Sequence, residues 1–108
     1  MSRGDFVTVA LQGDFGRPRP ALVIQADPFA EHATVTLLLV SSALIEAPLL
    51  RVTVAPDAAN GLRQPSQIMI DKTMTVMRTK IGEAFGRLEA DAMLEVERRL
   101  AVFLGIAK

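Results

Sequence analysis

The sequence contains no cysteine, no tryptophan and no tyrosine, and it has a single histidine, His32. Without cysteine there is no disulfide, no thiolate metal site and no cysteine nucleophile. One histidine does not make a histidine-rich metal site, and Ser-His or Cys-His catalysis is not expected. Any catalysis would rest on Arg, Lys, Asp, Glu, Ser and Thr side chains. Such a set suits phosphoryl chemistry, in which fixed positive charge stabilises an anionic transition state, and we expect no metal and no cofactor.

An excess of one charge is also missing, because 12 basic and 12 acidic residues give a formal net charge of +0. A generally basic nucleic-acid coat is therefore excluded. No apolar run reaches the roughly 18 residues that a membrane span needs, and the N-terminal "MSRGDF" lacks the apolar stretch of a signal peptide. We expect one domain over residues 1–108, located in the cytoplasm and not bound to a membrane.

The charges are nevertheless unevenly distributed along the chain. Residues 51–80 hold five basic side chains against two acidic ones, whereas residues 83–97 hold five acidic side chains against one arginine. A neutral total can therefore conceal a basic face and an acidic helix.

What the chain does contain is a series of short apolar segments separated by turn signals. Residues 5–11, "DFVTVAL", alternate as a half-buried strand does, and "ALVIQ" (21–25) and "ATVTLLLV" (33–40) are continuous apolar runs typical of buried strands. Three further strands are predicted at 49–54, 66–71 and 74–78. Six short strands within about 80 residues favour a small closed or partly closed β-barrel.

The last segment, residues 88–108, has a helical pattern instead. Its apolar residues recur at helical spacing, and Gly105 follows where a helix C-cap glycine is expected. We therefore predict one amphipathic helix packed on the barrel, with its apolar positions in the core: Met93, Val96, Leu100, Phe103 and Leu104.

The stretch "GDFGRPRPALVIQAD" (13–27) holds the first candidate for chemistry. Arg19 lies between Pro18 and Pro20, which stiffen the backbone, and directly before a buried strand. Arginine binds phosphate through a planar fork and stays charged at any working pH, so Arg19 is a candidate anion-binding residue. The alternative is a solvated loop arginine, which is the interpretation we favour for Arg17 from the pattern alone.

Hydroxyl and carboxylate groups follow two other predicted strands. Ser41 and Ser42 come after the run "TLLLV", where a hydroxyl can orient a phosphate oxygen or simply begin a turn. Asp71 comes after "QIMI" and could accept a proton from a hydroxyl, or it could pair with Lys72 or Arg78. The residue pattern leaves both pairs of alternatives open.

In order, "RGDFVTV", "RPALVIQAD", "LLLVSS", "NGL", "IMIDKTMTVMRTKIG" and a helix ending "FLG" resemble the MazF/PemK family of toxin–antitoxin toxins over residues 3–104. The resemblance implies an SH3-like small barrel of the CcdB/MazF/PemK type, a homodimer, a cognate antitoxin partner, and metal-independent cleavage of single-stranded RNA.

Residue roles follow from the same resemblance. Family members use an arginine before the proline of the second strand and a Thr or Ser at the end of the third, which correspond to Arg19 and Ser41, with Ser42 as the other register. Asp71 matches an acidic position in some members and is the candidate base. Further RNA-binding candidates are basic or aromatic side chains and a hydroxyl: Phe15, Arg17, Ser42, Lys72, Arg78 and Lys80.

Two other functions remain as alternatives at this point. One is a CcdB-like gyrase poison, whose Trp-Gly-Ile-type end is matched here only by Gly105 and Ile106. The other is an inactive barrel that only binds an antitoxin. The chain also departs from the toxin pattern, because the loop before Arg19 is short and Met69 stands where one subgroup has arginine.

Overall fold

The structure is a computed structural model that describes residues 1–13 and 17–107. Its elements in chain order are β1 (Asp5–Ala10), β2 (Pro18–Val23), the 3-10 turn η1 (Asp27–Phe29), β3 (Thr34–Ser41), β4 (Arg51–Val54), β5 (Ser66–Met77), the 3-10 turn η2 (Arg78–Lys80), β6 (Ile81–Arg87) and α1 (Ala90–Phe103). The predicted mainly β fold with a C-terminal helix is confirmed.

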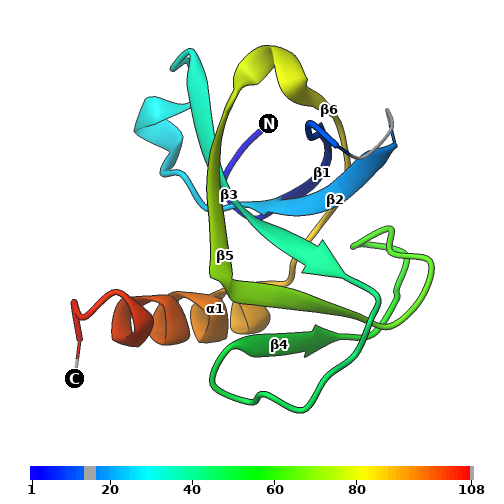
Figure 1. Cartoon of the computed structure of the whole chain (residues 1–108), viewed down its shortest axis with the longest axis vertical. Helices are drawn as coiled ribbons and strands as arrows, with labels where there is room; N and C mark the ends of the chain where they lie inside the picture. Colours follow the sequence, from blue (N-terminus) through cyan, green and yellow to red (C-terminus); the bar gives the residue numbers. More distant parts are fainter. Residues whose placement is uncertain (14–16, 108) are drawn as a thin grey trace.

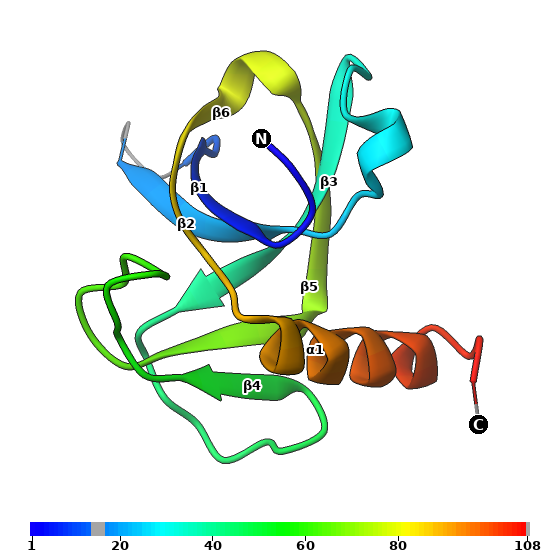
Figure 2. The same ribbon diagram turned by 180° about the vertical axis from the view of Figure 1, so that it is seen from behind.

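The strands form one antiparallel sheet in the order β4-β5-β3-β2-β1-β6. Its edge strands, β4 and β6, are not hydrogen-bonded to each other in the described ranges. The sheet curls strongly, and α1 lies across one side of it (Figures 1 and 2). Of the two predicted barrel forms, this is the partly closed one.

Strand β5 corrects one sequence prediction, since the segments 66–71 and 74–78 are a single strand and not two. Its ladder with β3 shifts register between Leu38, which faces Thr73, and Val40, which faces Ile68. Residues 69–72 bulge at this shift, and β5 bends (Figure 1). A bulge lets one long strand serve both halves of a curled sheet.

Strand β6 was not predicted, because "IGEAFGR" has two glycines and no clear alternation. It forms by pairing with the edge of β1, where Asp5 faces Arg87 and Phe6 faces Gly86. Strand formation depends strongly on such tertiary context.

Both faces of the sheet are buried, which explains the continuous apolar runs. One face packs against α1 through Phe6, Leu22, Leu38 and Ile68 among others. The other face is enclosed by the curl of the sheet and includes the apolar side chains of Val7, Val9, Ala21, Val23, Val35, Leu37, Leu39 and Met69. Alternate residues of β2 and β3 therefore point into different cores.

Helix α1 follows the predicted pattern at its start and departs from it at its end. Val96 is fully buried, and Met93 and Leu100 pack against the same core. Phe103 and Leu104 are about half exposed, so the prediction that they lie in the core was wrong. The sheet no longer covers the last turn. In the described ranges no helix is long and apolar enough to cross a bilayer.

Gly105 ends the helix as predicted. Its φ is 76°, a conformation that glycine adopts without steric cost, and the Ile106 N–H donates to Ala101 O at 2.8 Å.

Candidate functional site

A groove of about 790 Å³ lies where β2 begins and β3 ends. The start of β2, the end of β3 and the loop between β4 and β5 all contribute lining residues, and they lie on the same side of the molecule in both views of the ribbon (Figures 1 and 2). We call it the arginine groove, and it is lined by Thr8, Arg17, Pro18, Arg19, Pro20, Val40, Ser41, Ser42, Ala43, Gly61, Leu62, Arg63, Gln64, Ser66 and Phe85.

Arg19 lies on a strand and not in a loop, since β2 already begins at Pro18. Its cross-strand partner on β1 is Val9. The prolines on either side of it have no N–H to donate, so this part of β2 makes an incomplete ladder. The assigned β2–β3 pairs accordingly begin only at Ala21 and Leu39. The two strands are thus left unpaired at the groove.

The strand register brings Arg19 and Ser41 together. Ala21 faces Leu39, and continuing this antiparallel register by two residues sets Arg19 opposite Ser41. Side chains alternate along a strand, so both lie on the sheet face of Ala21 and Leu39. Residues 22 positions apart in the sequence therefore lie at the same end of one sheet face, at the rim of the groove, whereas Pro20 and Val40, which also line it, alternate onto the other face.

The Ser41 hydroxyl is held by a turn, which was one of the two alternatives for it. Its Oγ accepts a hydrogen bond from the Ala43 N–H at 3.0 Å. A hydroxyl that accepts in this way still has its own hydrogen to donate. The turn therefore fixes the oxygen and leaves Ser41 able to donate to an anion.

The arginines of the chain divide into two groups. Within the described residues, six of them bond to carboxylates or backbone carbonyls: Arg3, Arg51, Arg78, Arg87, Arg98 and Arg99. The other three, Arg17, Arg19 and Arg63, make no ion pair or hydrogen bond within that part of the chain, and all three line the arginine groove. None of the described residues that line it is acidic. The positive charge of these three arginines is therefore not neutralised by the described residues that line the groove.

Asp71, the predicted base, does not line the groove. It lies in the bulge of β5, and its Oδ1 accepts from Arg51 Nη1 at 2.5 Å. Burial alone would raise the pKa of Asp71, but the hydrogen bond and the charge of Arg51 outweigh it and lower that pKa below its ordinary value. The carboxylate therefore stays ionised as the partner of Arg51, and its catalytic role remains a prediction.

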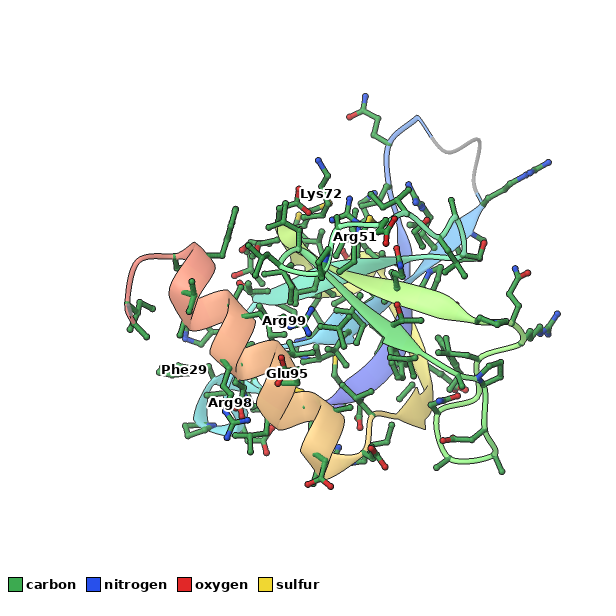
Figure 3. The ribbon with its side chains drawn as sticks, turned by 90° about the horizontal axis from the view of Figure 1, so that it is seen from below. Phe29, Arg51, Lys72, Glu95, Arg98 and Arg99 are labelled. Carbon is green, nitrogen blue, oxygen red and sulfur yellow. The ribbon has the colours of Figure 1, made fainter. Side chains whose placement is uncertain are left out.

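Arg51 belongs to a small network that we call the ion-paired cluster: Arg51, Asp71, Glu95 and Arg99. Arg99 donates to Glu95 at 2.7 Å and to the backbone carbonyl of Arg51 at 2.9 Å. Figure 3 shows Glu95 and Arg99 on α1 below the strand that carries Arg51. This cluster joins the helix to β4 and β5.

The remaining RNA-binding candidates divide between the groove and other parts of the molecule. Arg17 and Ser42 line the groove, and Phe15 lies outside the described residues. Lys72 and Lys80 are exposed on β5 and η2 and do not line it. Arg78 donates to the carbonyls of Ala30 and His32, so its guanidinium holds the η1 loop. None of these roles is tested by the geometry.

Sequence reasoning missed the second wall of the groove, which is formed by Gly61, Leu62, Arg63 and Gln64. The signal for it was the Asn60-Gly61 pair, which predicts a tight turn. The turn was visible in the sequence, but its place beside β2 was not.

Metal ligands do not gather in the described residues: no three His, Asp or Glu side chains there are placed to hold an ion.

Comparison with known proteins identifies relatives over almost the whole chain. A family described as the PemK-like, MazF-like toxins of type II toxin–antitoxin systems matches residues 2–104. A protein named probable endoribonuclease MazF, from Mycolicibacterium smegmatis, is 44% identical over 108 residues, which cover 99% of each chain.

Solved structures show the same fold. An endoribonuclease in complex with its cognate antitoxin, from a mycobacterial species, has a TM-score of 0.83 at 19% identity and covers 100% of this chain and 98% of its own. A MazE–MazF crystal structure from Deinococcus radiodurans has a TM-score of 0.80 at 24% identity and covers 99% of this chain and 97% of its own.

Proposed function

The chain belongs to the PemK-like, MazF-like toxins of type II toxin–antitoxin systems, and from that premise we propose that it is an endoribonuclease that cuts single-stranded RNA. The relative at 44% identity carries that activity in its name. The observation that carries the proposal is that Arg19 and Ser41 line one groove, together with Arg17 and Arg63, and that these three arginines have no protein partner in the described chain. Such a groove suits the polyanionic backbone of RNA.

The proposed reaction is attack by a ribose 2′-hydroxyl on the adjacent phosphorus. The 2′-oxygen loses its proton and forms a bond to phosphorus, while the bond from phosphorus to the 5′-oxygen breaks and that oxygen gains a proton. The products are a 2′,3′-cyclic phosphate and a 5′-hydroxyl. DNA lacks the attacking hydroxyl, so only RNA would be cut.

Arg19 and Ser41 act on the charge that develops at phosphorus. The Arg19 guanidinium stabilises the dianionic phosphorane, and the Ser41 hydroxyl donates to a non-bridging oxygen. Each preorganised donor of this kind contributes about 3 kcal/mol to transition-state stability. The role of Asp71 as the base stays a prediction, since its carboxylate bonds to Arg51 outside the groove.

The proposal includes a homodimer and an antitoxin as partners and the cytoplasm as the site of action. The similar mycobacterial structure holds an endoribonuclease with its cognate antitoxin, and the one from Deinococcus radiodurans holds MazE with MazF. An acidic antitoxin segment and RNA are both polyanions, so we propose that they compete for the arginine groove.

Cleavage of a mixed-sequence single-stranded RNA in the presence of EDTA tests the nuclease. Wild-type protein should yield fragments with 2′,3′-cyclic phosphate and 5′-hydroxyl ends, and Arg19→Ala should yield none. Arg98→Ala is the matched control, because Arg98 is an exposed arginine on α1, away from the groove. Intact RNA, together with gyrase-dependent DNA breaks, would replace the nuclease with a gyrase poison.

A second experiment tests the shared groove. An acidic antitoxin peptide should displace an uncleavable 2′-O-methyl RNA from the wild-type protein in a competition titration. Simultaneous binding of peptide and RNA would refute the competition and leave the nuclease proposal intact.

A further inference from the structure

We infer that Arg63 is a phosphate-binding residue of the second groove wall and holds an RNA phosphate that flanks the one being cleaved. The inference rests on the proposed function, and it adds a residue of the β4–β5 loop to the RNA contacts. It also predicts that the substrate must extend beyond a single linkage.

The position of Arg63 is the first argument. Arg17 and Arg19 lie at the start of β2, and Arg63 lies in the loop between β4 and β5, so the groove receives its arginines from two separate segments. Both segments lie on the same side of the molecule (Figures 1 and 2). Since Arg19 and Ser41 are committed to the scissile phosphate, a cation on the other segment is placed to meet a different phosphate of the same strand.

The loop that carries Arg63 is anchored, which is the second argument. Asn60 is only 3% exposed, and its side chain accepts from the N–H groups of Asp57 and Leu62 at 3.1 and 3.0 Å. Its Nδ2 donates to Ala55 O at 2.9 Å. A buried amide that satisfies three backbone groups fixes the path of the loop.

Strand β6 holds the same loop from the outside. The Arg87 N–H donates to Ala59 O at 2.8 Å. Gly86 lies so close that a Cβ added there would be 1.9 Å from Asn60 O, and a Cβ added at Gly61, whose φ is 68°, would be 2.4 Å from Phe85 O. Arg63 therefore lies two residues after Gly61, in a loop whose backbone is held against β6.

Charge is the third argument. Three arginines line one groove with no carboxylate among its described lining residues, whereas elsewhere in the described chain arginines are paired. Like charges placed together repel each other and are not expected without an anion to neutralise them. The RNA backbone is such an anion, because each phosphate carries one negative charge that can pair with one arginine.

Arg63→Gln tests the inference, with Arg98→Gln as the control that removes the same charge outside the groove. Affinity for an uncleavable 2′-O-methyl RNA pool is measured by fluorescence anisotropy at several salt concentrations. The substitution should weaken binding about 5- to 10-fold at low salt and reduce the slope of log affinity against log salt by about 0.7, the value for one phosphate contact on a single strand. Single-turnover cleavage at saturating protein should keep its rate within about twofold.

If Arg63→Gln binds like Arg98→Gln with an unchanged salt slope, Arg63 does not contact phosphate. If it slows cleavage at saturation instead, it acts at the scissile linkage and not beside it. If wild-type protein binds RNA without cutting it, the proposed function fails while the binding comparison still decides the role of Arg63. A protein that binds no RNA would overturn both.

Discussion

The arginine groove and the ion-paired cluster use the same side chain for opposite purposes. In the cluster, Arg51 and Arg99 bond to Asp71, Glu95 and backbone carbonyls. Their charges are neutralised by these partners, and the bonds join α1 to the sheet. In the groove, Arg17, Arg19 and Arg63 have no such partner among the described residues. The comparison teaches that the charge count of a segment does not identify a binding surface. What identifies it is whether the fold supplies the counter-ion.

The largest effect is expected when one arginine is removed from the arginine groove and, separately, one from the ion-paired cluster. Arg19→Gln should lower the single-turnover cleavage rate about 10²- to 10³-fold, because a preorganised donor to the transition state is lost. It should change the free energy of unfolding by less than about 0.5 kcal/mol. Arg51→Gln should do the reverse, costing about 1–3 kcal/mol through the unpaired Asp71 and leaving cleavage by folded protein near wild type.

Both variants are measured by urea denaturation and by RNA cleavage at a temperature where each is folded. The division of roles would be refuted if Arg51→Gln, shown to be folded, lost cleavage as completely as Arg19→Gln.

The next effect concerns the support of the second groove wall. Gly86→Ala should destabilise the protein by about 1–3 kcal/mol, because its Cβ would meet the backbone oxygen of Asn60 at 1.9 Å. Gly82→Ala is the matched control on the same strand, where the nearest atom is the Thr8 hydroxyl, which can rotate away. Thermal unfolding measures both. Equal losses of stability would mean that the loop is not rigidly held against β6.

Strong local patterns were sufficient to predict much of the fold. The buried strands of residues 21–25 and 33–40, the helix and its Gly105 cap all depend on neighbouring residues, which the sequence displays directly. The merging of two predicted strands into β5 depends on a bulge opposite β3. The formation of β6 depends on the free edge of β1. Neither partner is close in sequence, so neither was predicted.

The site divides in the same way. The residue pattern made Arg19 and Ser41 separate candidates, each beside an apolar run, and only the resemblance to the MazF/PemK family joined them in one site. The pairing of Asp71 with Arg51, 20 residues earlier, and the arrival of Arg63 beside β2 required the folded chain. From sequence alone the predicted partners of Asp71 were Lys72 and Arg78, and both predictions were wrong, since Asp71 bonds to Arg51 and Arg78 bonds to backbone carbonyls.

The stabilising effect of the Arg51–Asp71 ion pair in the ion-paired cluster should depend on pH. Asp71→Asn should lower the free energy of unfolding by about 1–2 kcal/mol at pH 7, since a charge-assisted hydrogen bond is lost. The pKa of Asp71 is lower in the fold than its ordinary value of 3.8, so the pair stabilises the protein above that pH. Its contribution should disappear as the pH falls through the folded-state pKa.

Urea denaturation of wild-type protein and Asp71→Asn at pH 7 and at progressively more acid pH measures this. Their difference in unfolding free energy should narrow below pH 3.8. A difference that stays constant into acid would show that the carboxylate charge does not stabilise the fold.

The smallest expected effect concerns the exposed lysines outside both regions. Lys72 and Lys80 do not line the groove, and they form no ion pair within the described residues. They can therefore act on RNA in the groove only through long-range electrostatic attraction. Lys80→Gln should weaken RNA binding less than about threefold at low salt, and the effect should vanish near 0.3 M salt, where exposed charges are screened beyond roughly 6 Å. Anisotropy measured alongside Arg63→Gln provides the comparison. A loss at Lys80 as large as that at Arg63, with an equal change in salt slope, would mean that RNA follows β5 and η2 and that the arginine groove is only part of its path.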